Sequence, residues 1–389
     1  MTLAAPASSM ELSDFAGQPS WRFASDRVEA AVTRTGGHLG PVRFALDGTT
    51  VEPYSVAPWA EEAPSPDLPP MLQALRGDFF CAPFGGNETV HRGEQHPPHG
   101  ETANATWRCE SIEQSADAAR LHLSLATTVR PGRVDKFIEL RAGQTAVYCR
   151  HVVTGMAGPM NLGHHAMLKF PDAPGSGHLS TSRVRYGQVA PLPLEDPAKR
   201  GYSALRSGGL FRRLDRVPLA AGGTTDVSRY PARRGFEDLV MLVHEAREDF
   251  AWTAVTFPAE GYVWYALKDP RTLRSTICWL TNGGRHYPPW NGRHVNILGL
   301  EEVTSYFHYG LAESVAENPV NRLGYPTAVE LTADRPLTVN YIMGVAAIPA
   351  GFGSVRTIRT TRDAITLVSP TGGQATAAVD VGFLYQSPP

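Results

Sequence analysis

The chain has 389 residues, of which 42% are hydrophobic and 19% are charged, and its net charge at pH 7 is −2. This balance argues against binding to nucleic acid or to an anionic membrane as the main activity. The length is ample for a large buried core, and all-β folds often reach this size as one domain. The 37 Gly and 32 Pro residues indicate many turns and few helices.

The N-terminal segment has neither a basic start nor a long apolar run. We therefore expect a loose tail over residues 1–20, without a signal peptide or a membrane span. The widely spaced cysteines are Cys81, Cys109, Cys149 and Cys278. Their spacing does not suit a zinc site built from cysteine pairs, so we expect free thiols and a cytoplasmic location.

Strand patterns begin directly after this tail. Residues 27–46 predict a hairpin around Gly36 and Gly37, residues 120–129 alternate between apolar and polar side chains, and residues 136–155 predict a second hairpin. Further strand-like segments occupy the second half of the chain, at residues 238–246, 250–257, 261–267, 275–281, 295–303, 337–348 and 377–385.

Helices are predicted in only two short segments, residues 194–207 and residues 304–319. No fixed-period repeat is present, which argues against a propeller, and no clear linker divides the chain. We therefore predict an all-β fold, a large antiparallel β-sandwich with few short helices, formed as a single domain over residues 21–389.

Residues 75–107 are typical of a long loop, because Gly, Pro and His are frequent there. Long loops in compact proteins usually carry a function. The histidines could bind a metal, transfer protons, hold a ligand or lie on a polar surface. We expect His91 and His96 to be solvent-exposed. Since His91, His96 and His99 form no His-x-His motif, neither a metal site nor a cofactor is predicted.

Two pairs of adjacent polar residues occur in strand-like segments: His164 with His165, and Glu301 with Glu302. Successive side chains of a strand point to opposite faces of its sheet. At most one member of each pair can therefore face a given pocket. The sequence does not decide which histidine does so.

A histidine and a carboxylate that face one cleft suit the opening of a sugar hemiacetal. A base removes the proton of the anomeric hydroxyl and an acid protonates the ring oxygen, and each group contributes roughly 10²–10⁴-fold to the rate. Aromatic side chains would stack on the apolar face of the sugar, although they also suit the core of a sandwich. The candidates for such a wall are Trp264, Tyr265, Trp279 and Trp290.

Several short motifs occur in an order that is known from one superfamily. They are Arg76-Gly77-Asp78, Pro83-Phe84-Gly85, His99-Gly100, Trp107, the segment around His164-His165, and Glu301 after a short apolar strand. With this order the chain resembles the galactose mutarotase-like superfamily, which includes aldose 1-epimerases and hexose-phosphate epimerases. The resemblance implies an elongated antiparallel β-supersandwich and catalysis without a metal or other cofactor.

The resemblance also implies roles for single residues. Glu301 would be the general base and His165 the general acid. The substrate-binding residues would be Arg76, His99, His164 and either Glu237 or its neighbour Asp238. Ala103 stands where hexose-phosphate epimerases have an arginine that suits a phosphate. An unphosphorylated sugar is therefore the small-molecule partner that we expect.

Other functions stay open, because one fold can host several chemistries. A non-catalytic carbohydrate-binding protein would keep the pocket without a matched acid and base. An isomerase, a polysaccharide lyase or a glycoside hydrolase is a further alternative, and the hydrolase would need a second carboxylate near Glu301. The candidates for that carboxylate are Asp78, Glu101 and Glu237. A homodimer also stays open. The leading hypothesis is an aldose 1-epimerase-like enzyme whose Glu301, His99 and His165 converge on one groove.

Overall fold

The computed structural model describes residues 10–63 and 66–387, and the all-β fold predicted from the sequence is confirmed. Neighbouring strands of the large sheets pair antiparallel. Within the described residues the α-helices are two short ones, α1 (Pro70–Gln73) and α2 (Leu311–Val315).

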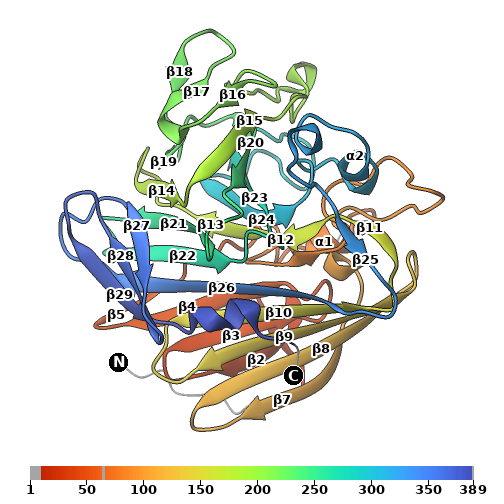
Figure 1. Ribbon diagram of the computed structural model, residues 1–389, viewed down its shortest axis with the longest axis vertical. Coiled ribbons are helices and arrows are strands. Elements are labelled where there is room, and N and C mark those ends of the chain that lie inside the picture. The colour runs from red at the N-terminus through yellow and green to blue at the C-terminus, as the bar shows by residue number, and fades with distance from the viewer. Residues whose placement is uncertain (1–9, 64–65, 388–389) are drawn as a thin grey trace.

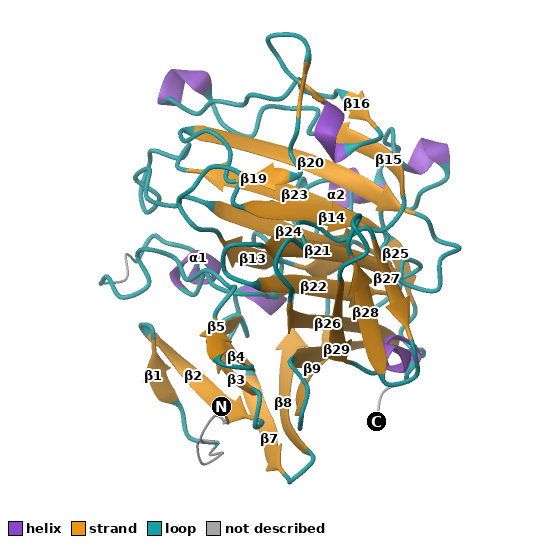
Figure 2. Ribbon diagram, turned by 90° about the vertical axis from the view of Figure 1, so that its left-hand side faces the viewer, coloured by secondary structure: helices purple, strands orange, loops and turns teal. Residues whose placement is uncertain are grey.

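Three sheets make up most of the molecule (Figure 1, Figure 2). The first has five strands, β1 (Ser13–Phe15), β2 (Gln18–Ala24), β3 (Val28–Thr33), β4 (Leu39–Leu46) and β5 (Thr49–Val51). The second has nine, β7 (Arg108–Gln114), β8 (Ala118–Thr127), β9 (Gly132–Arg141), β10 (Ala146–Thr154), β14 (Gly177–Thr181), β19 (Arg229–Tyr230), β21 (Ala251–Phe257), β22 (Tyr262–Lys268) and β26 (Leu337–Ala347). The third has eight, β6 (Phe80–Cys81), β12 (Leu162–His164), β13 (Ala166–Lys169), β15 (Val184–Val189), β16 (Leu210–Phe211), β20 (Phe236–His244), β23 (Ser275–Asn282) and β24 (Ile297–Thr304).

The spatial order of the nine-stranded sheet is β19-β14-β21-β22-β26-β10-β9-β8-β7. The eight-stranded sheet has the order β16-β15-β20-β23-β24-β12-β6, with β13 also paired to β24. Smaller pairs and sheets are formed by β11 (Gly158–Met160) with β25 (Val329–Leu331), β17 (Val217–Pro218) with β18 (Thr224–Thr225), and β27 (Thr357–Thr360) with β28 (Ala364–Val368) and β29 (Gln374–Ala378).

The central strands of the eight-stranded sheet are buried along nearly their whole length, because both faces of the sheet are covered. Along β23, Cys278 and Leu280 enter the main core, which also contains side chains of the nine-stranded sheet. Ile277 and Trp279 point to the opposite face and enter a second apolar cluster. The candidate site lies on this second face.

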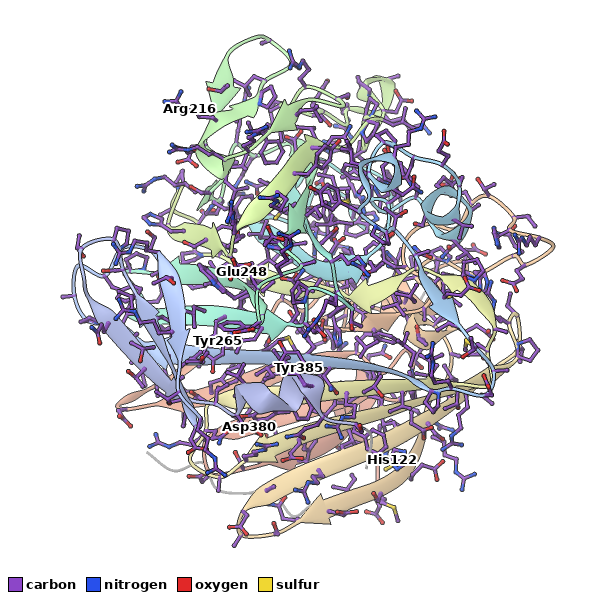
Figure 3. All side chains as sticks on the ribbon, viewed as in Figure 1. His122, Arg216, Glu248, Tyr265, Asp380 and Tyr385 are labelled. Atoms are coloured by element: carbon purple, nitrogen blue, oxygen red, sulfur yellow. The ribbon has the colours of Figure 1, made fainter. Side chains whose placement is uncertain are left out.

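The outer face of the nine-stranded sheet is covered by β27, β28, β29 and the 3-10 helix η5 (Val381–Tyr385). Tyr265 belongs to this outer cluster (Figure 3), whereas Trp264 on the same strand belongs to the main core. Both side chains are therefore packing residues, although the sequence made them candidates for the wall of a sugar site.

Local predictions are confirmed for strands more often than for helices. The hairpin predicted over residues 27–46 is confirmed as β3 paired with β4. The helical segments are shorter than predicted, since residues 194–207 contain only the 3-10 turn η2 (Pro197–Lys199) and residues 304–319 contain α2. Pro197 at the start of η2 and Arg200, in the left-handed conformation at its end, limit that helix to one turn.

Residues 13–20, which we expected in a loose tail, form β1 and the start of β2. They are held there because the guanidinium of Arg76 donates hydrogen bonds to the carbonyls of Phe15 and Ala16, at 2.8 and 2.9 Å. Residues 1–9 of the expected tail lie outside the described residues. The single domain over residues 21–389 stays a prediction. Across the ranges 10–63 and 66–387, no helix is both long and apolar enough to cross a bilayer.

A buried ion pair joins the two large sheets. Lys268 of β22 and Glu302 of β24 are each about 1% exposed, and the ammonium donates to the carboxylate. The two carboxylate oxygens also accept hydrogen bonds from the hydroxyls of Thr253 and Thr276, at 2.5 and 2.6 Å. Such a pair is costly to break, because removal of one partner leaves a buried charge without compensation.

We predict that Lys268→Met lowers the free energy of unfolding by about 3–5 kcal/mol, since Glu302 would be left in the core without its cationic partner. The double variant Lys268→Met/Glu302→Gln should recover most of that loss because it removes both charges. Urea unfolding of the three proteins measures the effect. A single variant as stable as the wild type would contradict the prediction.

Candidate active site

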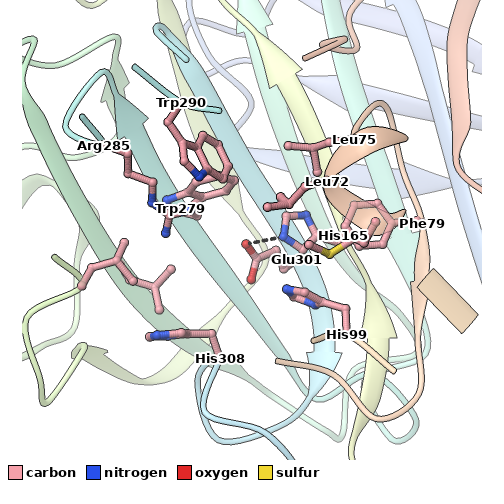
Figure 4. A pocket seen from close by; sticks show the side chains of 13 residues that line it. Leu72, Leu75, Phe79, His99, His165, Trp279, Arg285, Trp290, Glu301 and His308 are labelled. Atoms are coloured by element: carbon pink, nitrogen blue, oxygen red, sulfur yellow. Dashed lines mark ion pairs between the residues drawn. The ribbon is translucent and has the colours of Figure 1, made fainter. Parts of the chain in front are cut away.

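A pocket opens on the second face of the eight-stranded sheet (Figure 4). Its empty volume, including space open to solvent, is about 480 Å³. The lining side chains are Met71, Leu72, Leu75, Phe79, His99, His165, Leu194, Leu239, Trp279, Arg285, Trp290, Glu301 and His308.

The floor of the pocket is a histidine opposite a carboxylate. His165 stands between β12 and β13, and Glu301 projects from the neighbouring β24. His165 Nε2 and Glu301 Oε1 are 3.3 Å apart, and the side chains are 7% and 3% exposed. The imidazole of His165 stacks on Phe79, with ring centroids 4.6 Å apart. The backbone N–H of His165 donates to the carbonyl of Phe79. The ring is therefore held in a fixed orientation toward the carboxylate.

Burial moves the pKa values of the two groups in opposite directions. Loss of solvent raises the pKa of Glu301 to about 8, with Arg285 opposing the rise, and it lowers the pKa of His165 to about 3. Both shifts favour the uncharged form. Near neutral pH the pair consequently holds one proton. An acid and a base in contact, with pKa values separated by their surroundings, are typical of catalytic sites.

His99 reaches the same pocket from the long loop of residues 75–107. Its ring centroid lies 5.1 Å from that of His165, and Nδ1 faces the backbone N–H of Gly85 and the thiol of Cys81, each at 3.4 Å. With Nδ1 accepting from these two groups, Nε2 carries the proton and is a hydrogen-bond donor. Burial lowers the pKa of His99 well below its usual value, so this ring is neutral.

Gly77 fixes the course of the chain at the entry to this loop. Its φ is +54°, and a Cβ at this position would come within 1.6 Å of the carbonyl oxygen of Leu39. Only glycine fits so close an approach in this backbone conformation. The Arg76-Gly77-Asp78 motif therefore has a structural reason for its glycine.

Two polar lining residues were not among the residues singled out from the sequence. His308 follows β24, and burial lowers its pKa to about 4. Arg285 lies in the loop between β23 and β24, with its guanidinium 4.9 Å from the ring centroid of Trp279 and 4.6 Å from that of Trp290. Its Nε donates to Glu195 Oε1 at 2.6 Å, whereas its two terminal nitrogens make no hydrogen bond to the described residues. The frequent Gly and Pro of residues 283–292, which indicate a loop, were the available signal.

Comparison with solved structures identifies the architecture. A proposed aldose 1-epimerase from Klebsiella pneumoniae has a TM-score of 0.59 and 14% identity, with 86% of this chain and 81% of that chain covered. A galactose mutarotase-like protein from Clostridium acetobutylicum has a TM-score of 0.56 and 12% identity, with 87% and 98% covered. A homologue of aldose epimerase from C. elegans has a TM-score of 0.52 and 11% identity, with 84% and 98% covered.

The chain has the galactose mutarotase-like fold. This agrees with the superfamily that the sequence motifs suggested. No family model and no curated protein matches the chain by sequence. At identities of 11–14% the likeness extends to the fold, and the chemistry has to be argued from the side chains.

Arg76 does not reach the pocket of this mutarotase-like fold, although we expected it to hold the substrate. Its side chain is fully buried and donates to the carbonyls of Phe15, Ala16 and Ala74. Loss of solvent lowers its pKa to about 10. The guanidinium thus fastens β1 and α1 to the start of the long loop, and Arg285 is the arginine that lines the pocket.

His164 points away from the pocket, as the alternation of side chains along a strand requires. Its Nδ1 lies 2.8 Å from Asp78 Oδ2, and its ring packs against His151 and Tyr341, at centroid distances of 4.9 and 4.3 Å. His164 therefore packs in the core and does not line the pocket, where we expected it to bind the substrate. Of the two adjacent histidines, His165 is the one that faces the pocket. Asp78, the partner of His164, does not line the pocket either.

Glu237 lies behind the pocket wall instead of in it. Its carboxylate accepts hydrogen bonds from Trp279 Nε1, Thr281 Oγ1 and the backbone N–H of Gly284, at 3.1, 2.9 and 3.0 Å. Burial raises its pKa to about 7. The alternative, Asp238, accepts from the backbone N–H groups of Ala204 and Leu205. Glu237 thus positions Trp279, and neither acid lines the pocket.

The remaining histidines of the long loop form a separate polar cluster. His96 was expected to be exposed, but it is 5% exposed and its Nε2 lies 3.0 Å from Glu94 Oε2. Glu94 also accepts two hydrogen bonds from Arg130, at 3.0 and 2.7 Å. His91 is partly exposed. Across the part of the chain that the structure describes, no three His, Cys, Asp or Glu side chains are grouped as metal ligands.

We predict that Arg76→Gln lowers the free energy of unfolding by about 1–3 kcal/mol, because buried carbonyls lose their hydrogen-bond donors. Ligand affinity should change little, since Arg76 does not line the pocket. Arg285→Gln is the matched control, and it should weaken ligand binding with a smaller loss of stability. Urea unfolding and calorimetric sugar titration measure both effects. Weaker sugar binding by Arg76→Gln at unchanged stability would restore the original expectation.

Proposed function

We propose that the protein is an aldose 1-epimerase-like enzyme, which interconverts the anomers of an unphosphorylated sugar by opening and closing its ring. The observation that carries this proposal is the contact of His165 with Glu301 at the floor of this pocket. The anomeric hydroxyl and the ring oxygen are bonded to the same carbon. A base and an acid that act on them must therefore lie within a few ångström of each other.

In the reactive form of the pair, the shared proton is on His165 and Glu301 is a carboxylate. Glu301 takes the proton of the anomeric hydroxyl while His165 gives its proton to the ring oxygen, and the bond from the anomeric carbon to the ring oxygen breaks. The product is the open-chain aldehyde. Rotation about its first carbon–carbon bond and reversal of the proton transfers close the ring as the other anomer, and the pair regains its starting protonation.

The other polar side chains of the pocket bind and orient the ring. His99 presents an Nε2–H donor, and Arg285 presents the two terminal nitrogens that have no partner among the described residues. Trp279 and Trp290 supply aromatic surface for the apolar face of the sugar. Donors fixed before the substrate arrives lose little entropy on binding and favour a single reactive geometry.

A glycoside hydrolase is less well supported, because it requires two carboxylates that flank the scissile bond. Of the described residues that line the pocket, Glu301 alone is a carboxylic acid. Asp78 and Glu237 are held by other groups, and Glu101 accepts hydrogen bonds from the backbone of Thr128 and Val129. A carbohydrate-binding protein without catalysis would not need the shared proton of His165 and Glu301.

The remaining expectations stay proposals. We propose a small-molecule sugar as the only partner that the reaction requires, with no metal or cofactor among the catalytic groups. The cytoplasmic location, the lack of nucleic-acid and membrane binding, and the open question of a homodimer stay as they were derived from the sequence.

We predict that Glu301→Gln and His165→Asn each reduce the rate of anomer exchange by roughly 10²–10⁴-fold, since either change removes one of the two proton-transfer groups. Saturation-transfer NMR or polarimetry on a panel of aldoses measures the rate. Exchange at the wild-type rate in both variants would rule out the proposed acid and base. If the wild-type protein accelerates no sugar but binds one, the carbohydrate-binding alternative holds.

Stability measurements show whether Glu301→Gln keeps its fold. The folded-state pKa of Glu301 is raised to about 8 from an unfolded value near 4.5, so this group stabilises the fold at low pH and loses that contribution as the pH rises through 8. Glutamine has no such loss. The variant should therefore lose no stability as the pH rises toward 8, and urea unfolding at the pH of the activity assay shows whether lost activity reflects unfolding.

We predict that kcat/KM falls above about pH 8, the raised pKa of Glu301, approaching tenfold per pH unit. Above this pH the proton shared by His165 and Glu301 leaves, and the pair then lacks its acid. Below pH 8 the pair holds this single proton, and His165 takes up a second proton only near pH 3, its lowered pKa. The profile should therefore be flat from roughly pH 6 to 7.5. An activity that rises through pH 8 would instead identify Glu301 as a base that acts without His165.

A further inference from the structure

The pocket is lined by both polar and aliphatic side chains. The polar residues are His99, His165, Arg285, Glu301 and His308. Part of the aliphatic lining is a wall of Met71, Leu72 and Leu75, which come from one segment of the chain. Figure 4 shows Leu72 and Leu75 on the side of the pocket where His165 and Phe79 stand, with Arg285 and Trp290 across from them. Leu72 and Leu75 can neither donate a hydrogen bond to a sugar hydroxyl nor accept one from it, and the thioether of Met71 is only a weak acceptor.

The wall is a fixed surface of the fold. It includes Met71 and Leu72 of α1 and Leu75 just beyond it. The backbone N–H of Met71 donates to Asn104 Oδ1 at 3.1 Å, and the carbonyl of Leu72 accepts from Trp59 Nε1 at 2.8 Å. Pro70 lies at the first helical position, where its fixed φ suits a helix start. The aliphatic side chains are therefore held in place before any ligand arrives.

This wall discriminates between substituents of the sugar. A hydroxyl pressed against it would lose its hydrogen bonds to water without replacement, whereas a methyl group would gain from leaving water. In the proposed reaction His165 protonates the ring oxygen. The ring carbon on the far side of that oxygen carries the exocyclic carbon of a hexose, so this substituent lies on the side of His165, where Leu72 and Leu75 stand.

We propose that the pocket is specific for 6-deoxyaldoses, sugars in which the exocyclic carbon is a methyl group. This inference rests on the proposed function, because the placement of the exocyclic carbon follows from the role of His165. Hydroxyls on the other ring carbons face His99, His308 and Arg285. The methyl group faces the aliphatic wall, where it needs no hydrogen-bond partner.

The experiment compares sugars that differ only in the oxygen on the exocyclic carbon, D-fucose with D-galactose and L-rhamnose with L-mannose. In at least one pair the deoxy sugar should have a kcat/KM roughly 10- to 100-fold higher, the discrimination that one hydroxyl against an apolar surface provides. Anomer exchange is measured by NMR, and affinity is measured by calorimetry. If the parent sugar of each pair is exchanged and bound as well as its deoxy form, the proposal is wrong.

Leu72→Gln tests the wall itself, since glutamine supplies both a donor and an acceptor where the hydroxyl would lie. The preference for the deoxy sugar should then shrink toward equality. Leu192→Gln is the matched control, because Leu192 is 63% exposed and does not line the pocket, and it should keep the wild-type preference. A preference unchanged in Leu72→Gln would overturn the assignment of this wall.

Failure of this inference differs from failure of the proposed function. If no aldose is exchanged faster than in buffer, the proposed catalysis is wrong, and calorimetry with the same pairs still decides whether the deoxy sugar is preferred. Exchange of all four sugars at equal rates would support the catalysis and contradict the specificity. Absence of both exchange and binding for every sugar would contradict both.

Discussion

The alternation of side chains along β24 is the constraint on which the site depends. Glu301 points into the pocket, and Glu302 points between the two large sheets, where it pairs with Lys268. A slip of one residue in the pairing of β24 would exchange the two carboxylates between these environments. The ion pair of Glu302 therefore holds the register that presents Glu301 to His165. Stability of the sandwich and geometry of the site are coupled through adjacent residues of one strand.

Those features that follow from the periodicity of strands could be predicted from the sequence. The antiparallel all-β fold, the hairpin of β3 and β4, and the rule that His164 and His165 face opposite sides all follow from the two-residue repeat. Which side is the pocket depends on how the sheets pack, and a single sequence does not contain that information directly. The order of short motifs compensated in part, because it selected Glu301 and His165 together.

The functions of the arginines could not be predicted in the same way. Arg76 lies in a motif that suggests substrate binding, but in this chain residues 13–20 form a hairpin whose carbonyls, those of Phe15 and Ala16, accept its hydrogen bonds. Arg285 lies far along the chain in a loop with no regular period, and only tertiary packing against Trp279 and Trp290 brings it to the site. Long-range contacts such as these hydrogen bonds and ring contacts leave no local pattern in the sequence.

The electrostatics of the pocket suit an uncharged ligand. The lowered pKa values of His99, His165 and His308 keep the imidazoles neutral, and the charge of Arg285 is balanced by its hydrogen bond to Glu195. The pocket thus offers oriented dipoles with little net charge, which would serve a neutral sugar better than an anionic one. The desolvation that raises the pKa of Glu301 also strengthens each hydrogen bond inside the pocket, because screening by water is lost. In the proposed reaction, burial of Glu301 and His165 therefore costs stability and at the same time supplies the conditions under which a proton can pass between the sugar and the protein.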